Sequence, residues 1–210
     1  MTAPAAHSAA SGTLLGLLIA HAQLDRSLRI AAVLFLTALT AAAAQVSIPL
    51  PFTPVPFTLQ PMVVLLGGAA LGARLGMTSQ VLYLLIGAAG APVFAASGVL
   101  PQGIFRLLGP TGGYLLSYPL AAFVVGLLAE RGFDRRYLTS VLAMTAGLAV
   151  VFGAGVAWLA WFAVPAPVGL SAALAGGLYP FLPADLLKIG VAAAVMPGVW
   201  KLLGRPGPSR

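Results

Sequence analysis

The segment Pro180–Lys188 carries an acid and a base that could do chemistry together. It reads PFLPADLLK, and Asp185 and Lys188 stand three residues apart in a chain in which only 7% of residues are charged. Positions i and i+3 share one face of a helix, so the two side chains can meet. Pro183 suits the first turn of a helix, which puts Asp185 near the positive end of the helix dipole. Ionisable groups are costly in an apolar segment and indicate a functional site that faces a bundle interior.

The composition around this pair indicates an integral membrane protein. Of the 210 residues, 60% are hydrophobic, and the mean hydropathy is +1.01. The apolar residues fall in blocks suited to crossing a bilayer core, which takes ~20 helical residues. The sequence therefore predicts an all-α polytopic membrane protein, with six transmembrane helices in a single bundle. The expected spans are residues 30–48, 62–73, 77–91, 112–129, 137–164 and 180–201.

The charged residues between these spans predict how the chain crosses the membrane. The net charge is +7, but the basic residues are dispersed between apolar blocks, which argues against a nucleic-acid-binding face. With six helices, all but two of the 11 basic residues fall on one side, which the positive-inside rule assigns to the cytoplasm. The two exceptions are Arg106 and Lys188. We therefore expect cytoplasmic termini, with Arg106, Asp185 and Lys188 toward the outer side.

Three connections link these spans on the outer side. Residues 48–61 are rich in proline and should form a stiff, extended loop rather than a helix, because proline lacks an N–H and fixes φ. The second connection, residues 92–111, carries Arg106, and the third, residues 165–177, is rich in small residues. The predicted parts of the chain are an N-terminal arm with a short interfacial segment (1–29), a membrane domain (30–203) and a C-terminal tail (204–210).

Arg106, Asp185 and Lys188 have the chemistry to hold a small anion. An ionised aspartate offers only acceptors, a lysine three donors and an arginine a planar fork of donors. Their summed charge of +1 suits a ligand with one anionic group, neutral N–H donors and a carbonyl. A mostly apolar wall is usual for such a pocket. The aromatic residues in and beside the outer loops are Phe52, Phe57, Phe94, Phe105 and Tyr114.

Each of these features also has a purely structural interpretation. An Asp–Lys pair at this spacing can be an ion pair that satisfies only itself. Arg106 can lie among the lipid head groups, and the phenylalanines can be packing or interface residues. The glycines of GPTGGYL, residues 109–115, also suit a turn that leads into a small-residue helix interface. The convergence of these features on one side favours a binding site.

Several classes of enzyme and metal site are excluded. The chain has no cysteine, and its only histidines, His7 and His21, lie in the N-terminal arm. No intramembrane Ser–His dyad or histidine metal cluster can therefore form. A G-x-x-x-x-G-K-[ST] motif is absent, so an ATP-driven process would need a motor on another polypeptide. We expect neither catalysis nor a cofactor.

Four segments together match the pattern of a known family. They are AQVSIPLPFTPVPFTLQ (44–60), LYLLIGAAGAPVFA (82–95), LLGPTGGYLLSYPLAAFVVG (107–126) and PFLPADLLK (180–188). The chain thereby resembles the BioY family, the biotin-specific S-components of energy-coupling factor (ECF) transporters. The resemblance implies a six-helix protein of a bacterial or archaeal cytoplasmic membrane, which binds biotin in an outward pocket. By that analogy, Asp185 and Lys188 contact the biotin head group or its carboxylate. Their expected neighbours in the site are Gln60, Arg106 and Tyr114.

The same resemblance implies protein partners. Members of the family contact a transmembrane coupling subunit through small residues on the first helix, and two cytoplasmic ATPases complete the assembly. The small face available here comprises Ala38, Ala41 and Ala42, which suits close helix packing. The position four before Ala38 is Leu34, so the family pattern is imperfect at this point. The chain could also work alone.

Two competing hypotheses stay open. In one, the chain is a self-sufficient, proton-coupled secondary transporter of another small organic anion, and Asp185 and Lys188 relay protons. In the other, it is a structural membrane subunit without a ligand.

Overall fold

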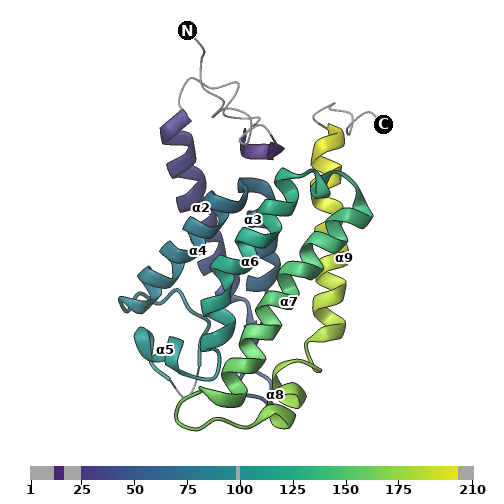
Figure 1. The fold of residues 1–210 in the computed structure, drawn as a ribbon. Coiled ribbons are helices and arrows are strands. Elements are labelled where there is room, and N and C mark those ends of the chain that lie inside the picture. Colours follow the sequence, from purple (N-terminus) through teal and green to yellow (C-terminus); the bar gives the residue numbers. More distant parts are fainter. Residues whose placement is uncertain (1–11, 17–24, 98–99, 203–210) are drawn as a thin grey trace.

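Six helices form the body of the molecule and run roughly side by side (Figure 1). The structure is a computed structural model that describes residues 12–16, 25–97 and 100–202. Within these ranges the long helices are α2 (Asp25–Gln45), α3 (Gln60–Leu71), α4 (Ala73–Ala88), α6 (Gly112–Glu130), α7 (Tyr137–Trp161) and α9 (Leu182–Leu202). Of the described helices, α2, α6, α7 and α9 are long and apolar enough to span a membrane. The prediction of an all-α membrane protein is confirmed, whereas six spans remain a prediction.

The helix boundaries differ from the predicted spans in ways that local chemistry explains. The first helix begins at Asp25 rather than at residue 30, so it includes the basic residues Arg26 and Arg29, which were expected to precede the span. Helix α7 ends at Trp161 rather than at 164, where the N–H groups of Phe162 and Ala163 both donate to the Trp158 carbonyl, and the residue before Pro165 disfavours helical backbone. Helix α9 begins at Leu182, and Pro183 lies in its first turn as predicted.

Helices α3 and α4 are separated by a single residue, Gly72. Its φ of +87° lies in a region that favours glycine, and this turn replaces the wider break expected around residues 74–76. The backbone N–H of Ala73 donates to Oε1 of Glu130 at 2.9 Å. This bond satisfies one of the unpaired N–H groups at the start of α4 and fixes the turn beside the end of α6.

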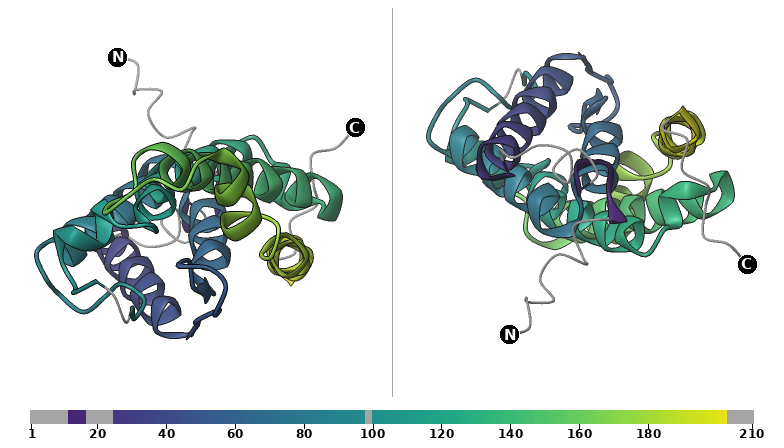
Figure 2. Two further views of the ribbon diagram at one scale, coloured as in Figure 1. Left: turned by 90° about the horizontal axis from the view of Figure 1, so that it is seen from below. Right: turned by 90° about the horizontal axis from the view of Figure 1, so that it is seen from above.

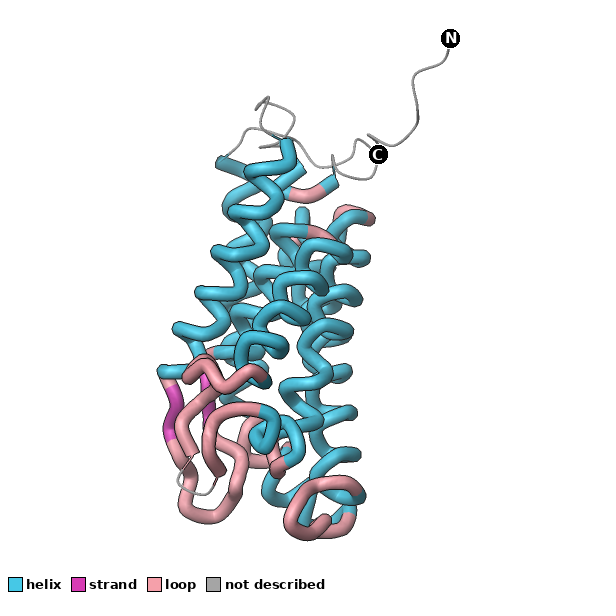
Figure 3. Tube along the Cα trace, turned by 90° about the vertical axis from the view of Figure 1, so that its left-hand side faces the viewer, coloured by secondary structure: helices cyan, strands magenta, loops and turns pink. Residues whose placement is uncertain are grey.

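Shorter elements occupy the three outer connections. The proline-rich loop contains no helix, as predicted, and its ends pair as antiparallel strands β1 (Ser47–Ile48) and β2 (Phe57–Thr58). The other two connections contain the helices α5 (Ile104–Leu108) and α8 (Leu170–Gly177), which the sequence analysis did not predict. Figures 1 and 3 show these loops together at one end of the bundle, opposite the start of α2 and the end of α9.

Helix α6 lies at the centre of the packing, against α3, α4 and α7. Close contact is possible because Gly126 lets the α6 backbone approach Gly72 and Ala73, where a Cβ atom would overlap the neighbouring backbone. Helix α9 packs against α7 and α3, and the views along the bundle place it at the periphery (Figure 2).

The opposite end of the bundle is held by a buried acid. The 3-10 helix η3 (Phe133–Arg135) joins α6 to α7, and Asp134 accepts a 2.6 Å hydrogen bond from the indole N–H of Trp200 on α9. The Arg135 guanidinium lies over the Trp200 ring, 4.9 Å from its centroid. Burial raises the pKa of the Asp134 carboxyl above its usual value. Nearby, Thr13, Leu15 and Gly16 are buried, whereas residues 17–22 of the arm's expected interfacial segment and the tail at 204–210 lie outside the described residues.

Candidate binding site

A cavity of about 660 Å³ opens at the end of the bundle where the outer loops gather. Its volume lies within the range of small-molecule sites, roughly 300–1,000 Å³. The walls come from the proline-rich loop, the second connection and helices α3, α5, α6, α7 and α9. All five residues predicted to bind a ligand line this one cavity: Gln60, Arg106, Tyr114, Asp185 and Lys188.

Asp185 and Lys188 form a close, largely buried ion pair. Lys188 Nζ lies 2.7 Å from Asp185 Oδ1, and the two side chains are 13% and 7% exposed, respectively. The same ammonium donates to the carbonyl of Thr58 at 2.6 Å and lies 3.5 Å from the ring centroid of Phe57. The pair is therefore electrically neutral, and Lys188 is tied to the proline-rich loop as well as to its own helix.

Aromatic rings form part of the cavity wall, although not all of the predicted ones. Phe57 and Phe94 line the cavity, whereas Phe52 and Phe105 are 65% and 59% exposed and point elsewhere. Phe181 was missed, and it stacks on Phe57 with centroids 6.5 Å apart and planes 8° apart. The available signal was its position four residues before Asp185 within the predicted span 180–201, where both side chains would share one helix face.

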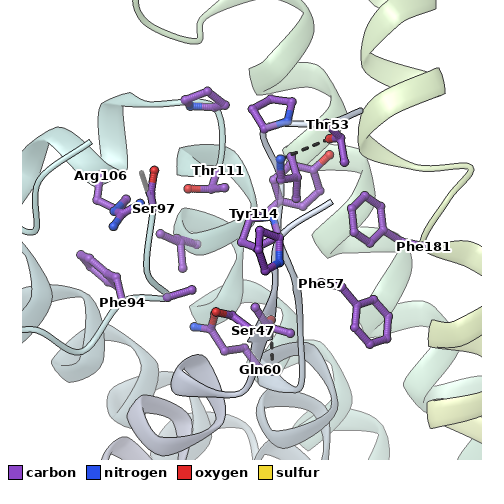
Figure 4. A pocket seen from close by; sticks show the side chains of 18 of the residues that line it. Ser47, Thr53, Phe57, Gln60, Phe94, Ser97, Arg106, Thr111, Tyr114 and Phe181 are labelled. Atoms are coloured by element: carbon purple, nitrogen blue, oxygen red, sulfur yellow. Dashed lines mark hydrogen bonds between the residues drawn. The ribbon is translucent and has the colours of Figure 1, made fainter. Parts of the chain in front are cut away.

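Arg106 lies in α5, on the opposite side of the cavity from Phe181, with Tyr114 between them (Figure 4). The residue is only 5% exposed, so it does not reach out to lipid head groups. Its Nε is buried without a hydrogen-bond partner among the described residues. Burial lowers the pKa of the Arg106 guanidinium, and the nearby Tyr83 hydroxyl acts in the opposite direction. This arrangement leaves a buried cation with donor capacity at the cavity wall.

Gln60 is held in place by an aromatic residue of α4. Its amide Nε2 donates to the hydroxyl of Tyr83 at 2.7 Å, and Tyr83 donates to the carbonyl of Val93 at 3.1 Å. The Tyr83 ring also meets Phe94 edge to face, with centroids 5.4 Å apart. Sequence reasoning missed Tyr83, because it lies inside an apolar span with no charged neighbour.

Tyr114 contributes its ring to the cavity and its hydroxyl to a neighbouring element. The hydroxyl donates to the carbonyl of Gly177 at the end of α8, at 2.8 Å. The ring packs edge to face against Phe152, with centroids 6.4 Å apart. In this arrangement Tyr114 anchors the end of α8, and its hydroxyl proton is engaged by the Gly177 carbonyl.

The predicted partner residues lie away from the cavity, on α2. Ala38 and Ala42 are exposed, Ala41 is half-buried, and Leu34 is 53% exposed on the same helix. A face of small and apolar side chains on α2 is thus accessible in this chain.

The sequence profile of the BioY family matches residues 15–205. The chain belongs to the BioY family. Its relatives in this family include the "Biotin transporter BioY" of Thermotoga maritima, which is 40% identical over 159 residues, covering 76% of this chain and 88% of the relative. The "Probable biotin transporter BioY" of Pyrococcus horikoshii is 42% identical over 158 residues, covering 75% of this chain and 87% of the relative.

The fold of this BioY chain is also similar to a solved structure. The crystal structure of the S-component for biotin from an ECF-type ABC transporter superposes with a TM-score of 0.74 at 24% sequence identity. The match covers 89% of this chain and 96% of the other. The two proteins share the fold.

Proposed function

We propose that this chain is the biotin-binding S-component of an ECF-type transporter, a multi-pass membrane protein that takes up biotin and has no catalytic role. One observation carries the proposal. In a BioY-family chain, a neutral Asp185–Lys188 pair and the buried cation of Arg106 line a single cavity of small-molecule size. Gln60 and Tyr114 complete the proposed site.

The charges in the cavity support an orientation for biotin. Biotin carries a ureido ring with two N–H donors and a carbonyl at one end, and a carboxylate at the other. We infer that the ureido ring lies at the Asp185–Lys188 pair, where the second carboxylate oxygen and the ammonium can meet its donors and its carbonyl. The biotin carboxylate then lies at Arg106, whose guanidinium has an unused buried donor. The ring stack of Phe57 and Phe181 supplies apolar surface between the polar anchors.

We further propose six membrane crossings with both termini in the cytoplasm. The start of α2 and the end of α9 lie at the end of the bundle away from the cavity (Figure 1). The proposed parts are an arm (1–29), a membrane domain embedded in lipid (30–203) and a tail (204–210).

The exposed face of α2 is the proposed contact for a transmembrane coupling subunit. Ala38 and Ala42 lie four residues apart and are exposed, so another helix could approach closely, with Ala41 at the edge of the contact. Two cytoplasmic ATPases would drive the complex, since the sequence carries no P-loop motif.

Titration of the purified protein with biotin tests the proposed function. We expect saturable binding, and Asp185→Asn and Lys188→Ala should each weaken it by about 2–5 kcal/mol, because each leaves a desolvated partner unpaired. No binding at micromolar biotin would contradict the proposal. Uptake driven by a pH gradient in vesicles that contain this protein alone would instead support a secondary transporter.

A further inference from the structure

The proline-rich loop between β1 and β2 covers the cavity, and most of residues 49–58 line it. We call residues 49–58 the lid. One attachment joins the lid to α9 and to the residue before it: Lys188 of α9 donates to the carbonyl of Thr58, and Phe181 stacks on Phe57. A second attachment joins it to α8, where the Thr53 hydroxyl donates to the carbonyl of Gly176 at 2.7 Å.

Helix α8 is itself weakly packed. Of its eight residues, only Ala173 and Gly177 are buried, and Leu170 at its start is 48% exposed. Elements with few buried contacts open at low free-energy cost, so individual hydrogen bonds matter for their position. At the N-terminal side of α8, the N–H groups of Val168 and Gly169 donate to carbonyls at the end of α7.

The C-terminal side of α8 is held by two side chains that line the cavity. The last four carbonyls of a helix have no partner within the helix. In α8, the carbonyl of Gly176 is satisfied by Thr53 and that of Gly177 by Tyr114. A side chain at position 177 would collide with the Tyr114 hydroxyl, so glycine is required there for this bond.

These bonds form a series that runs from the bundle to the lid. Tyr114 anchors α8 to α6, and Thr53 anchors the lid to α8. The attachment on α9 depends on Lys188, which also faces the Asp185 carboxylate at the proposed ligand site. The attachment on α8 uses no ionisable group and no atom of that pair.

We propose that α8 holds the lid closed. Thr53 and Tyr114 are the positioning residues, and their hydrogen bonds set the rate at which ligand dissociates. This inference rests on the proposed function. Breaking either bond in the series detaches the lid from α6. Ligand then dissociates faster, whereas Asp185, Lys188 and Arg106 are unchanged.

Dissociation of labelled biotin into excess unlabelled biotin tests this series. Tyr114→Phe should raise the dissociation rate about 2- to 10-fold, the effect of losing one hydrogen bond. Thr53→Val should raise it at least as much, because the Thr53 hydroxyl also accepts a 3.2 Å hydrogen bond from the N–H of Val55 within the lid. The double variant should release biotin no faster than the faster single variant, because the two bonds act in series. If the rate increases of the two single variants multiply in the double variant, the two bonds act independently and the proposed series is wrong. Matched controls with wild-type rates are Thr139→Val, which removes an exposed bond to Arg136, and Tyr179→Phe, at a 58% exposed residue.

Hydrogen exchange of the ligand-free protein tests, independently of biotin binding, whether α8 holds the lid. Tyr114→Phe should accelerate exchange in α8 and also in the lid, although the deleted bond ends on α8. Exchange in the lid at the wild-type rate would overturn the proposal, whether or not the protein binds biotin. A wild-type protein that fails to bind biotin would instead overturn the proposed function.

Discussion

Two cations, Lys188 and Arg106, face the same cavity, and they differ in the acceptors that their N–H groups find. Lys188 is paired with Asp185, donates to the Thr58 carbonyl and lies over the Phe57 ring. Arg106 is buried, and among the described residues its Nε finds no acceptor. A buried donor that is left unsatisfied on a charged group is costly, so the guanidinium is better suited than the ammonium to receive a second anion.

We predict that Arg106→Gln weakens recognition of the biotin carboxylate and leaves recognition of the ureido ring unchanged. Affinity for biotin should fall by about 1.5–3 kcal/mol, the typical contribution of a hydrogen bond to a charged group. Affinity for biotin methyl ester should stay near the wild-type value for that ester, because the ester carries no negative charge. Lys188→Ala should weaken both ligands. Competition binding measures the affinities of both ligands for the wild type and the two variants, and an equal loss of acid and ester in Arg106→Gln would contradict this orientation.

The charged residues of the candidate site could be predicted from the chemistry of the sequence. The neutral residues Gln60 and Tyr114 were predicted to bind the ligand only through the family resemblance, and Phe181 and Tyr83 were not predicted. Asp185 and Lys188 stand out because ionisable groups are rare and costly in apolar helices, and topology alone groups them with Arg106. The hydroxyl of Tyr114 donates to the Gly177 carbonyl, and this partner depends on the path of α8, which the sequence does not predict. Likewise, loop conformation decides that Phe57 faces the cavity while Phe52 does not.

At the scale of elements, glycine positions determine how closely the helices approach. On α6, a Cβ atom at Gly126 would overlap the backbone of Gly72 and Ala73, whereas one at Gly153 on α7 would meet no atom within 4 Å. Both are glycines in apolar helices, and their sequence context does not distinguish them. The same limit applies to α5 and α8, which are too short for a clear helical period.

Gly126→Ala and Gly153→Ala form a matched pair for testing this packing. Gly126→Ala should destabilise the fold by about 1–3 kcal/mol, because the added methyl group requires the α3–α4 turn to move. Gly153→Ala should be neutral or stabilising by up to about 1 kcal/mol, since alanine is the better helix former. Thermal unfolding in detergent compares the two. Equal melting temperatures would show that the α6–α4 contact tolerates the extra atom.

At the scale of the whole molecule, helix α3 is too short to cross a membrane by itself. Twelve residues rise only about 18 Å, which is less than the ~30 Å of a bilayer core. Yet the turn after α3 reaches the end of α6, because Ala73 binds the carboxylate of Glu130. Helix α3 begins at Gln60, which lines the cavity. In the proposed six-span topology, the lid and cavity would supply the rest of the thickness, which predicts a binding site recessed below the outer membrane surface.

This arrangement predicts which positions are accessible from each side of the membrane. The chain has no cysteine, so one introduced thiol reports one position. Val168→Cys, at a 47% exposed position near the cavity, should react with a membrane-impermeant maleimide in intact cells. Arg74→Cys and Arg136→Cys, both at exposed positions at the other end, should react only after the cells are permeabilised. Labelling of Arg74→Cys in intact cells would mean that α3 and α4 turn back without crossing, and the number of spans would fall from six to four.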